Sequence, residues 1–475
     1  MNNETMSRVN YSLFVLLLAG FFLRVHDLGR QSLWLDEAYT WGVVVNTNWR
    51  DVWGAMLAVS DVSPLAYVIT KLTAPFLGTS EFGLRLSSAF FGWLAIAATY
   101  RVGKAMFGKS VGLLSAGVIS FSPFAVWYSQ DARPYGLYLL LGAFALWGLH
   151  RAERGRGWAV FTLASAAMYV THYVSALFVY AQAVYILTQL RRQPQLFRRW
   201  ALAQVVAVIP VGGWVIAFLS QRHLLTANSW IPPVTITTPL QTLWNFVGGD
   251  AARWSSGVAA GVIVVTGVIG WGAYKRWRSE GRSVQLLLWW LVLPLTTGWL
   301  FSLRLPVYID RFFEPAILTV ALLLAAGVSA LPGQWRRITA VLMMIGLLAG
   351  SARLFVDPAY SKEDWRGAAQ TLRAEGVTVG LIDAESLLGL TPYTPPGLRF
   401  GFARNKAELA ERLAEGRFVM VLRSPHESAH ALGEFGPFDP LTEGPEFFRQ
   451  WLAENPSVFV DVRPFTGLAL VAISK

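Results

Sequence analysis

The stretch YSLFVLLLAGFFLRV (residues 11–25), together with SLWLDEAYTW (residues 32–41) just after it, decides the class of this protein. The first segment is apolar over nearly the thickness of a bilayer, which predicts a membrane-spanning helix near residues 10–28. The second places two neighbouring carboxylates, Asp36 and Glu37, among aromatic residues at the mouth of that helix. Carboxylates at this depth in a membrane protein are costly, so we expect them to have a function.

The composition of the whole chain agrees with a membrane protein. Of its 475 residues, 54% are hydrophobic and only 15% are charged, and the mean hydropathy is +0.43. Cysteine is absent, which excludes disulfides, thiol nucleophiles and cysteine-ligated zinc. The net charge of +11 comes from basic residues in short loops between apolar runs, a pattern typical of membrane topology and not of nucleic-acid binding.

The loops alternate between two chemical types, and this alternation predicts the topology. One set is short and cationic, and by the positive-inside rule these loops are cytoplasmic. We therefore predict a multi-pass protein of the inner (plasma) membrane with about eleven spans, a retained and cytoplasmic N-terminus, and an extracytoplasmic C-terminus. The expected spans lie near residues 10–28, 83–101, 110–128, 134–150, 157–173, 174–190, 200–219, 257–275, 284–303, 312–331 and 336–354.

The composition changes after residue 356. Amphipathic helical patterns over residues 362–376, 405–416 and 446–455 alternate with apolar strand patterns over 377–384, 417–424, 457–464 and 467–475. The fold class we predict is therefore a polytopic α-helical membrane domain (1–356) followed by a small soluble extracytoplasmic α/β domain (357–475).

The external loops hold the residues that can carry chemistry. A carboxylate at the membrane interface, walled by Trp34 and Tyr39, suits a general base, and Asp36 and Glu37 are the candidates. Adjacent side chains on a helix diverge by about 100°, so the two need not share one task. The alternative is that Asp36 caps the start of an interfacial helix.

Two further external segments contain polar candidates. SDVSPLAYVITKL (residues 60–72) supplies Asp61 and Lys71, although its Ser-Pro is also ordinary chemistry for a helix start. WYSQDARPYGLYLLLG (residues 127–142) forms a short hairpin that contains Asp131, Arg133 and Tyr135. Arg133 has the forked donors that suit a phosphate at headgroup depth, or it pairs with Asp131 to close the turn.

Two more arginines stand at the outer ends of expected spans. RLPVYIDRFFEPAIL (residues 304–318) supplies Tyr308 and Arg311, and SEFGLRLSSAFFG (residues 80–92) supplies Arg85. Each arginine is a candidate phosphate ligand, with snorkelling to the interface as the alternative. The external histidines lack metal-ligand spacing, whereas a carboxylate site for Mg²⁺, Mn²⁺ or Ca²⁺ built from Asp36, Glu37, Asp61 or Asp131 is chemically possible.

Taken together, these motifs resemble the C-type (GT-C) membrane glycosyltransferases, among them the bacterial relatives of protein O-mannosyltransferases and the lipid A aminoarabinose transferase. The resemblance rests on LWLDEAYTW after the first span, DVSPLAY followed by SEFGLRLSSAFFG, YSQDARPYGLYLL in a hairpin, and YIDRFFEPAIL late in the membrane region. It covers about residues 10–355 in order and spacing. KEDWRGAA (residues 362–369) is a further sequence often seen in such proteins.

The resemblance implies a GT-C fold with interfacial helices in the first external loop and a specific reaction. A sugar is transferred with inversion from a polyprenyl-phosphate donor to a protein, lipid or glycan hydroxyl on the exoplasmic side. The resemblance implies that Asp36 is the general base, with Glu37 beside it, and that Arg133, Arg85, Arg311 and Lys71 hold the donor phosphate. Asp61, Asp131, Tyr135 and Tyr308 are then expected to contact substrates. No cofactor is implied beyond an optional divalent cation.

One motif departs from the pattern of the family. Relatives commonly read His-Pro-Pro-Leu or Lys-Pro-Pro-Leu where this chain has Val62-Ser63-Pro64-Leu65, so the expected basic residue is missing and Lys71 or the arginines must replace it. Two other functions stay open at this point: a transporter or flippase of polyprenol-linked lipids, and a ligase or polymerase that moves whole oligosaccharides. A transporter needs ionisable residues near the bilayer midplane, and the expected spans are nearly free of charge there.

Overall fold

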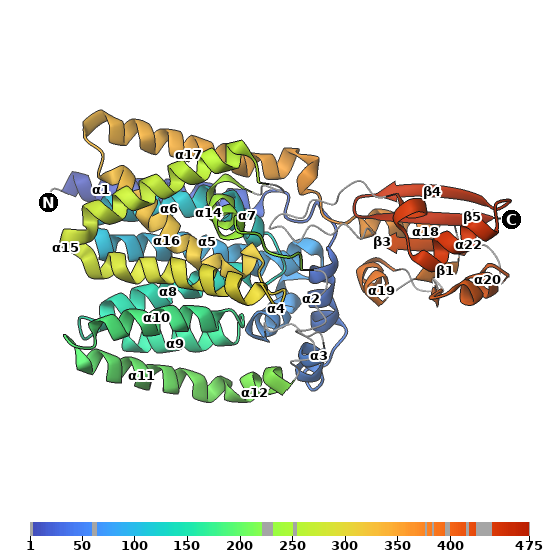
Figure 1. Ribbon diagram of the computed structural model, residues 1–475, viewed down its shortest axis with the longest axis horizontal. Coiled ribbons are helices and arrows are strands. Elements are labelled where there is room, and N and C mark those ends of the chain that lie inside the picture. Colours follow the sequence, from blue (N-terminus) through green and yellow to red (C-terminus); the bar gives the residue numbers. More distant parts are fainter. Residues whose placement is uncertain are drawn as a thin grey trace.

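The computed structural model describes residues 3–58, 64–220, 231–249, 254–375, 378–381, 384–394, 400–414, 418–423 and 439–474. Figure 1 shows an elongated molecule with a large helical bundle at one end and a small α/β part at the other. The first helix starts at the end of the bundle that lies farthest from the α/β part.

The bundle is formed by helices that follow the apolar runs of the sequence. They are α1 (Asn3–Val25), α2 (Leu35–Val45), α3 (Val52–Ala58), α4 (Pro64–Leu77), α5 (Glu81–Phe107), α6 (Lys109–Phe121), α7 (Pro123–Ser129), α8 (Tyr135–Ala152), α9 (Trp158–Tyr169), α10 (Ser175–Gln189), α11 (Pro194–Val208), η1 (Ile209–Val211), α12 (Gly212–Ser220), α14 (Thr238–Gly248), α15 (Ser256–Ser302), η2 (Asp310–Ala316), α16 (Ile317–Ser329), α17 (Gly333–Val356) and η3 (Pro358–Tyr360).

Within the described ranges, four helices are long and apolar enough to cross a membrane, or five if the bent pair α6 and α7 forms one span. The four are α5, α15, the continuous Asp310–Ser329 segment and α17. Helix α15 is broken at Glu280, where φ is −127° and ψ is 35°, so its two legs cover the two expected spans 257–275 and 284–303. Other expected spans lie on shorter helices such as α9. The number of about eleven spans therefore stays a prediction.

The candidate spans differ in how much protein surrounds them. Helix α16 is buried along almost its whole length, and its uniformly apolar sequence fits a helix enclosed by other helices. Helix α17 instead exposes Val341 and Leu342 to more than half of their surface, at 57% and 62%. Exposed apolar side chains in such a row are expected where a helix faces lipid.

The C-terminal part is a mixed five-stranded sheet with the order β2-β1-β3-β5-β4. Strands β2, β1 and β3 run parallel, and β5 pairs antiparallel with both β3 and β4. Its elements are α18 (Trp365–Glu375), β1 (Thr378–Leu381), α19 (Ala384–Leu390), η4 (Thr391–Tyr393), β2 (Phe400–Phe402), α20 (Lys406–Ala414), β3 (Phe418–Arg423), α21 (Pro440–Glu443), α22 (Glu446–Glu454), β4 (Phe459–Phe465) and β5 (Leu468–Ser474).

Alternation along the central strand gives this sheet two cores. Val419 and Val421 of β3 pack on one face against Trp365 of α18. Met420 of the same strand packs on the other face against Trp451 of α22, as the period of two requires. The four strands and three helices predicted from the sequence are confirmed, whereas β2, α19 and the short α21 were not predicted. The boundary at residues 356 and 357 stays a prediction.

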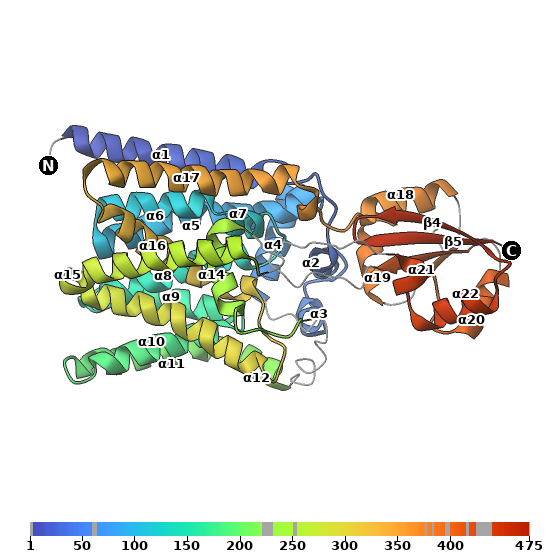
Figure 2. The same ribbon diagram turned by 45° about the horizontal axis from the view of Figure 1, so that its top comes forward.

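Two interfacial helices were expected in the first loop, and α2 and α4 occupy those positions. Figures 1 and 2 show α2 and α3 at the end of the bundle that faces the C-terminal part. Helix α2 packs against α4 on the bundle side and against α19 and η4 on the other. The hairpin that carries Asp131 and Arg133 lies at this end as well, since Thr40 Oγ1 of α2 donates to the Ala132 carbonyl at 2.8 Å. Gly136, just after the hairpin, lets α8 approach α5 closely. A Cβ at Gly136 would lie 2.4 Å from the Ser88 carbonyl oxygen.

Candidate functional site

The side chain of Glu37 is the centre of a buried ionic network. It is 0% exposed and accepts hydrogen bonds from Arg85 Nε at 2.7 Å and Arg85 Nη2 at 2.6 Å. The backbone N–H of Ala132 donates to it at 2.8 Å, and Lys362 Nζ lies 3.3 Å from Oε2. Burial raises the pKa of Glu37, but the cations of Arg85 and Lys362 outweigh that effect and lower it to about 2. Glu37 is therefore ionised at neutral pH and enclosed by its partners.

Arg85 is committed to this network. Besides Glu37, its guanidinium donates to the carbonyls of Leu28 at 2.9 Å, Gln31 at 2.9 Å and Ser32 at 2.8 Å. The side chain is almost completely buried. The sequence suggested Arg85 as a ligand of a donor phosphate, but all three of its nitrogens donate to protein acceptors. In this geometry Arg85 holds the loop after α1 and orients Glu37, and it is not placed to meet a lipid phosphate.

Lys362 supplies the second cation from the beginning of the C-terminal part. Its ammonium contacts both Glu37 and Asp131, and it lies 5.4 Å from the Trp127 ring. Asp131 is fully buried, and its burial raises its pKa although Lys362 acts in the opposite sense. Together with Arg85, the cluster has two carboxylates and two cations in a dry environment. Asp131 was expected to contact substrate, whereas the structure places it inside this network.

The side chain of Asp36 points away from the network and is partly open, with 21% of it exposed. Arg311 Nη2 lies 3.4 Å from Asp36 Oδ2 and its guanidinium lies over the Trp34 ring at 5.3 Å. Arg133 Nη1 donates to the backbone carbonyl of Asp36 and to Tyr67 Oη, both at 3.2 Å. Asp36 is not the N-cap, because α2 begins after Trp34. The partly exposed carboxylate and two arginines that were predicted separately thus meet on one face of α2.

The remaining predicted residues lie around this face or outside it. Lys71 Nζ donates to the carbonyls of Val44 at 2.8 Å and Thr47 at 2.6 Å, so it caps the C-terminal end of α2 instead of facing a ligand. Burial lowers the pKa of Lys71. Asp61 lies outside the described residues, as do Val62 and Ser63 of the departing motif.

The two predicted tyrosines are buried. Tyr308 Oη lies 2.9 Å from Thr242 Oγ1, which donates to Asp310 Oδ1 at 2.6 Å, and burial raises the pKa of Tyr308 well above its ordinary value. This contact fastens α14 to η2. The Tyr135 ring lies 5.0 Å from Tyr128 and 6.2 Å from His172 in an aromatic group. Whether either tyrosine contacts substrate stays a prediction.

Glu363 is a site-associated residue that the sequence reasoning missed. It is 0% exposed and accepts from the Leu35 N–H at 2.9 Å, from Trp365 Nε1 at 2.8 Å and from Arg423 Nε at 2.6 Å. Since Leu35 is the first residue of α2, Glu363 joins the start of that helix to the C-terminal sheet. The only signal for this role was the charged Lys-Glu-Asp run just after the last apolar stretch, within KEDWRGAA.

A metal centre does not emerge from the described ranges. Among them, no group of three or more His, Asp or Glu side chains is arranged to hold an ion. One of the candidate carboxylates, Asp61, lies outside those ranges, so dependence on a divalent cation stays a prediction.

Comparison with known proteins decides the fold. The family model of dolichyl-phosphate-mannose-protein mannosyltransferases matches residues 61–216. Among solved structures, ArnT from Cupriavidus metallidurans bound to undecaprenyl phosphate has a TM-score of 0.57 at 14% identity, over 98% of this chain and 98% of ArnT. The chain has the GT-C fold.

Two further GT-C structures show the same arrangement. The oligosaccharyltransferase AglB from Archaeoglobus fulgidus, in complex with an inhibitory peptide and a dolichol-phosphate, has a TM-score of 0.54 at 11% identity, over 88% of this chain and 70% of AglB. The mycobacterial arabinofuranosyltransferase AftD has a TM-score of 0.50 at 14% identity, over 98% of this chain and 41% of AftD. A comparison with curated proteins gave no match. The resemblance to GT-C glycosyltransferases inferred from the sequence motifs is confirmed.

Proposed function

We propose that this GT-C protein is an inverting glycosyltransferase that moves a sugar from a polyprenyl-phosphate donor to an acceptor hydroxyl at the exoplasmic face of the membrane. The observation that carries the proposal is the contrast within one turn of α2. Glu37 is sealed in a compensated network, whereas Asp36 is partly exposed and has Arg311 and Arg133 beside it. A base and two forked cations are the groups that this chemistry requires.

In the proposed reaction the Asp36 carboxylate accepts the proton of the acceptor hydroxyl. The hydroxyl oxygen forms a bond to the anomeric carbon as the bond between that carbon and the phosphate oxygen breaks. The electron pair leaves with the polyprenyl phosphate, whose charge increases, and attack from the opposite side inverts the anomeric centre. Arg311 and Arg133 are the cations placed to stabilise that phosphate, since fixed charges at the position of developing charge lower the barrier.

The buried network has a positioning role in this proposal. The backbone of Asp36 is fixed by three neighbours: the Ala132 N–H on Glu37, the Glu363 carboxylate on the Leu35 N–H, and Arg133 on the Asp36 carbonyl. A base must be held within a few tenths of an ångström of its working position, and buried salt bridges serve this purpose well even when they add little stability. The C-terminal part thereby contributes to the site without touching the substrate.

The fold alone does not separate this reaction from the transfer of a whole oligosaccharide, since AglB is an oligosaccharyltransferase. A single observation favours the transporter alternative. Glu314 lies in the Asp310–Ser329 span, is 0% exposed, and neither carboxylate oxygen has a hydrogen-bond partner among the described residues. An intramembrane carboxylate of this kind is typical of ion or proton pathways. Glu314 lies near the start of that span, three residues after Arg311, which fits a group behind the site better than a midplane pathway.

The test is transfer by the purified full-length protein from a panel of polyprenyl-phosphate monosaccharides and polyprenyl-linked oligosaccharides, with and without EDTA. The proposal expects one monosaccharide donor to be consumed and the anomeric configuration of the product to be inverted. Consumption of the oligosaccharide donors alone would favour the ligase. Movement of a labelled lipid between leaflets of a vesicle without any transfer would favour the transporter. Loss of activity in EDTA would establish a divalent cation as a requirement.

A further inference from the structure

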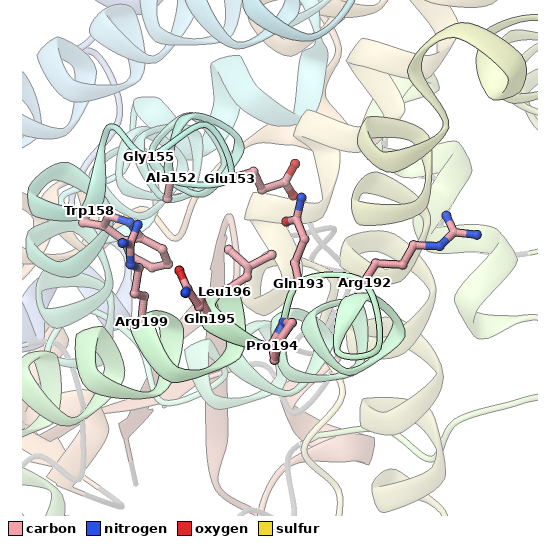
Figure 3. A pocket seen from close by; sticks show the side chains of 10 residues that line it. All are labelled: Ala152, Glu153, Gly155, Trp158, Arg192, Gln193, Pro194, Gln195, Leu196 and Arg199. Carbon is pink, nitrogen blue, oxygen red and sulfur yellow. The ribbon is translucent and has the colours of Figure 1, made fainter.

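Two polar regions of the described chain are not used by the proposed reaction. The first is an open cleft of about 340 Å³ at the end of the bundle opposite α2 (Figure 3). The arginines that line it, Arg192 and Arg199, are both exposed, so the cleft offers no enclosed site for a ligand. The second is a buried group of side chains that joins α14 to η2, directly beside Arg311.

Asp310 is the centre of this buried group. Asn245 Nδ2 donates to Oδ2 of Asp310 at 2.5 Å, and Thr242 Oγ1 donates to Oδ1 at 2.6 Å. The Thr242 hydroxyl has one proton, which it gives to the carboxylate, so Tyr308 Oη at 2.9 Å donates to Thr242 in turn. Thr242 and Asn245 are 0% exposed. Because α14 holds both carboxylate oxygens, the Asp310 side chain cannot turn without breaking two charge-assisted hydrogen bonds.

Arg311 follows Asp310 in the same turn of η2. Successive side chains of a 3₁₀ helix diverge by about 120°, since three residues make one turn. Asp310 points towards α14, whereas the Arg311 guanidinium reaches Asp36 at 3.4 Å. The anchor at Asp310 therefore fixes the backbone from which Arg311 extends. The pair repeats the division between Glu37 and Asp36, in which one side chain is anchored and its neighbour faces the site.

Helix α14 is also fastened to the segment that carries the other arginine. The Ser122 hydroxyl at the start of α7 donates to the Phe246 carbonyl at 2.7 Å, and the Phe246 ring lies 4.9 Å from the Phe124 ring. Figure 1 shows α7 beside α14, and the two helices pack against each other. Helix α7 leads into the hairpin that contains Arg133. Helix α14 thus connects the two segments that carry the arginines of the site.

We propose that Thr242 and Asn245 are positioning residues for the transfer reaction. Through Asp310 they hold Arg311 at the place where it meets the donor phosphate. This inference rests on the proposed function, because it takes Arg311 as a ligand of that phosphate. Both residues are buried behind the site and act without touching the substrate. Their role is important because a catalytic group that is misplaced by about 1 Å loses much of its effect.

The experiment is a double-mutant cycle on the full-length protein, with binding of polyprenyl phosphate and transfer of sugar as the two readouts. The variants are Thr242→Val and Asn245→Leu, each alone and combined with Arg311→Gln. Both keep the size of the side chain and remove its hydrogen-bond donor. Thr242→Ser is the conservative variant, since it keeps the hydroxyl. Thr319→Val is the matched control, because the buried Thr319 hydroxyl likewise joins two helices, α16 and α15, at 3.2 Å.

We expect Thr242→Val and Asn245→Leu each to bind polyprenyl phosphate about tenfold more weakly and to lower kcat by a similar factor, as misplacement of one charge-assisted contact predicts. In the Arg311→Gln background the same changes should have less than about a twofold effect, because the group that they position is gone. Thr242→Ser and Thr319→Val should stay within about twofold of the wild type. A tenfold loss that persists without Arg311, or wild-type binding by both α14 variants, would overturn the inference.

Failure of the proposed function gives a different result. If the binding data show this non-additivity but the wild type turns over no donor, the positioning inference stands and the transferase proposal fails. If the wild type transfers sugar and Thr242→Val does so equally fast, only the positioning inference fails. If Arg311→Gln binds polyprenyl phosphate as tightly as the wild type, Arg311 holds no phosphate and the inference is wrong.

Discussion

The two faces of helix α2 differ in how completely their charges are compensated. On one face Glu37 contacts Arg85, Lys362 and the Ala132 N–H, and no part of it is exposed. On the other, the Asp36 carboxylate lies 3.4 Å from Arg311, and about a fifth of it is exposed. Buried charges are tolerated only when they are paired, so the first face is suited to holding a shape. The second face keeps a carboxylate available to a reacting group, and this division explains why two neighbouring acids occur together.

The largest expected effect is a loss of stability caused by the substitution Glu37→Gln. This change leaves Arg85 and Lys362 buried beside a neutral amide, which we expect to lower the free energy of unfolding by about 3–5 kcal/mol. Thermal unfolding followed by size-exclusion chromatography measures the loss. Asp36→Asn is the matched control: it is partly exposed and its amide oxygen can still accept from Arg311, so we expect a smaller loss of about 1 kcal/mol. Equal losses in the two variants would mean that the faces do not differ.

The next largest effect is expected on the rate of transfer, from changes on the Asp36 face of α2. Arg311→Gln and Arg133→Gln each remove a cation proposed to stabilise the leaving phosphate, and we expect kcat/KM for transfer to fall by about 10²–10³-fold in each. Steady-state kinetics with the preferred donor is the measurement. Arg304 is exposed and lies two residues after the end of α15, so Arg304→Gln serves as the control and should leave the rate unchanged. Wild-type rates in both variants would remove the two arginines from the mechanism.

A smaller effect is expected at Lys362, which links Glu37 to Asp131. Lys362→Met leaves Asp131 buried without a cation, and a second change, Asp131→Asn, removes the orphaned charge. A double-mutant cycle on thermal stability should therefore give a coupling of about 1–3 kcal/mol between the two positions. Strictly additive losses would show that the pair does not act as one unit.

The smallest effect is on the pH dependence of stability. The folded pKa of Glu37, about 2, is below its ordinary value of 4.5, so its contribution is present above pH 4.5 and is lost as the pH falls towards 2. Asp131 acts in the opposite sense, because its pKa is raised and the folded state holds its proton more tightly. Unfolding temperatures measured from pH 7 to pH 3 should fall more steeply in the wild type than in Glu37→Gln. Parallel curves would contradict the assignment of Glu37 as the low-pKa group.

Local sequence patterns predicted most of the elements but not the partners within the site. Apolar runs and period-two alternation depend on neighbouring residues, so α5, α17, β3 and β5 were recognisable. The role of Arg85 was not, because an arginine at a helix end looks the same whether it meets a phosphate or a buried glutamate. Lys362 reaches Glu37 across 325 positions of the chain, and no periodicity encodes such a contact. Asp36, Arg133 and Arg311 were predicted individually from the motifs, whereas their meeting on one face required the fold.

The measurement that tests the account most directly is single-turnover transfer by Asp36→Asn beside Glu37→Gln, each purified and shown to be folded, with the donor that the wild type consumes. The account predicts that Asp36→Asn loses about 10²–10⁴-fold in the rate of transfer while it remains folded and binds the donor, since it lacks only the base. It predicts that folded Glu37→Gln retains a measurable rate. Transfer by Asp36→Asn at the wild-type rate would contradict the central claim, because the exposed carboxylate of α2 would then not be the base.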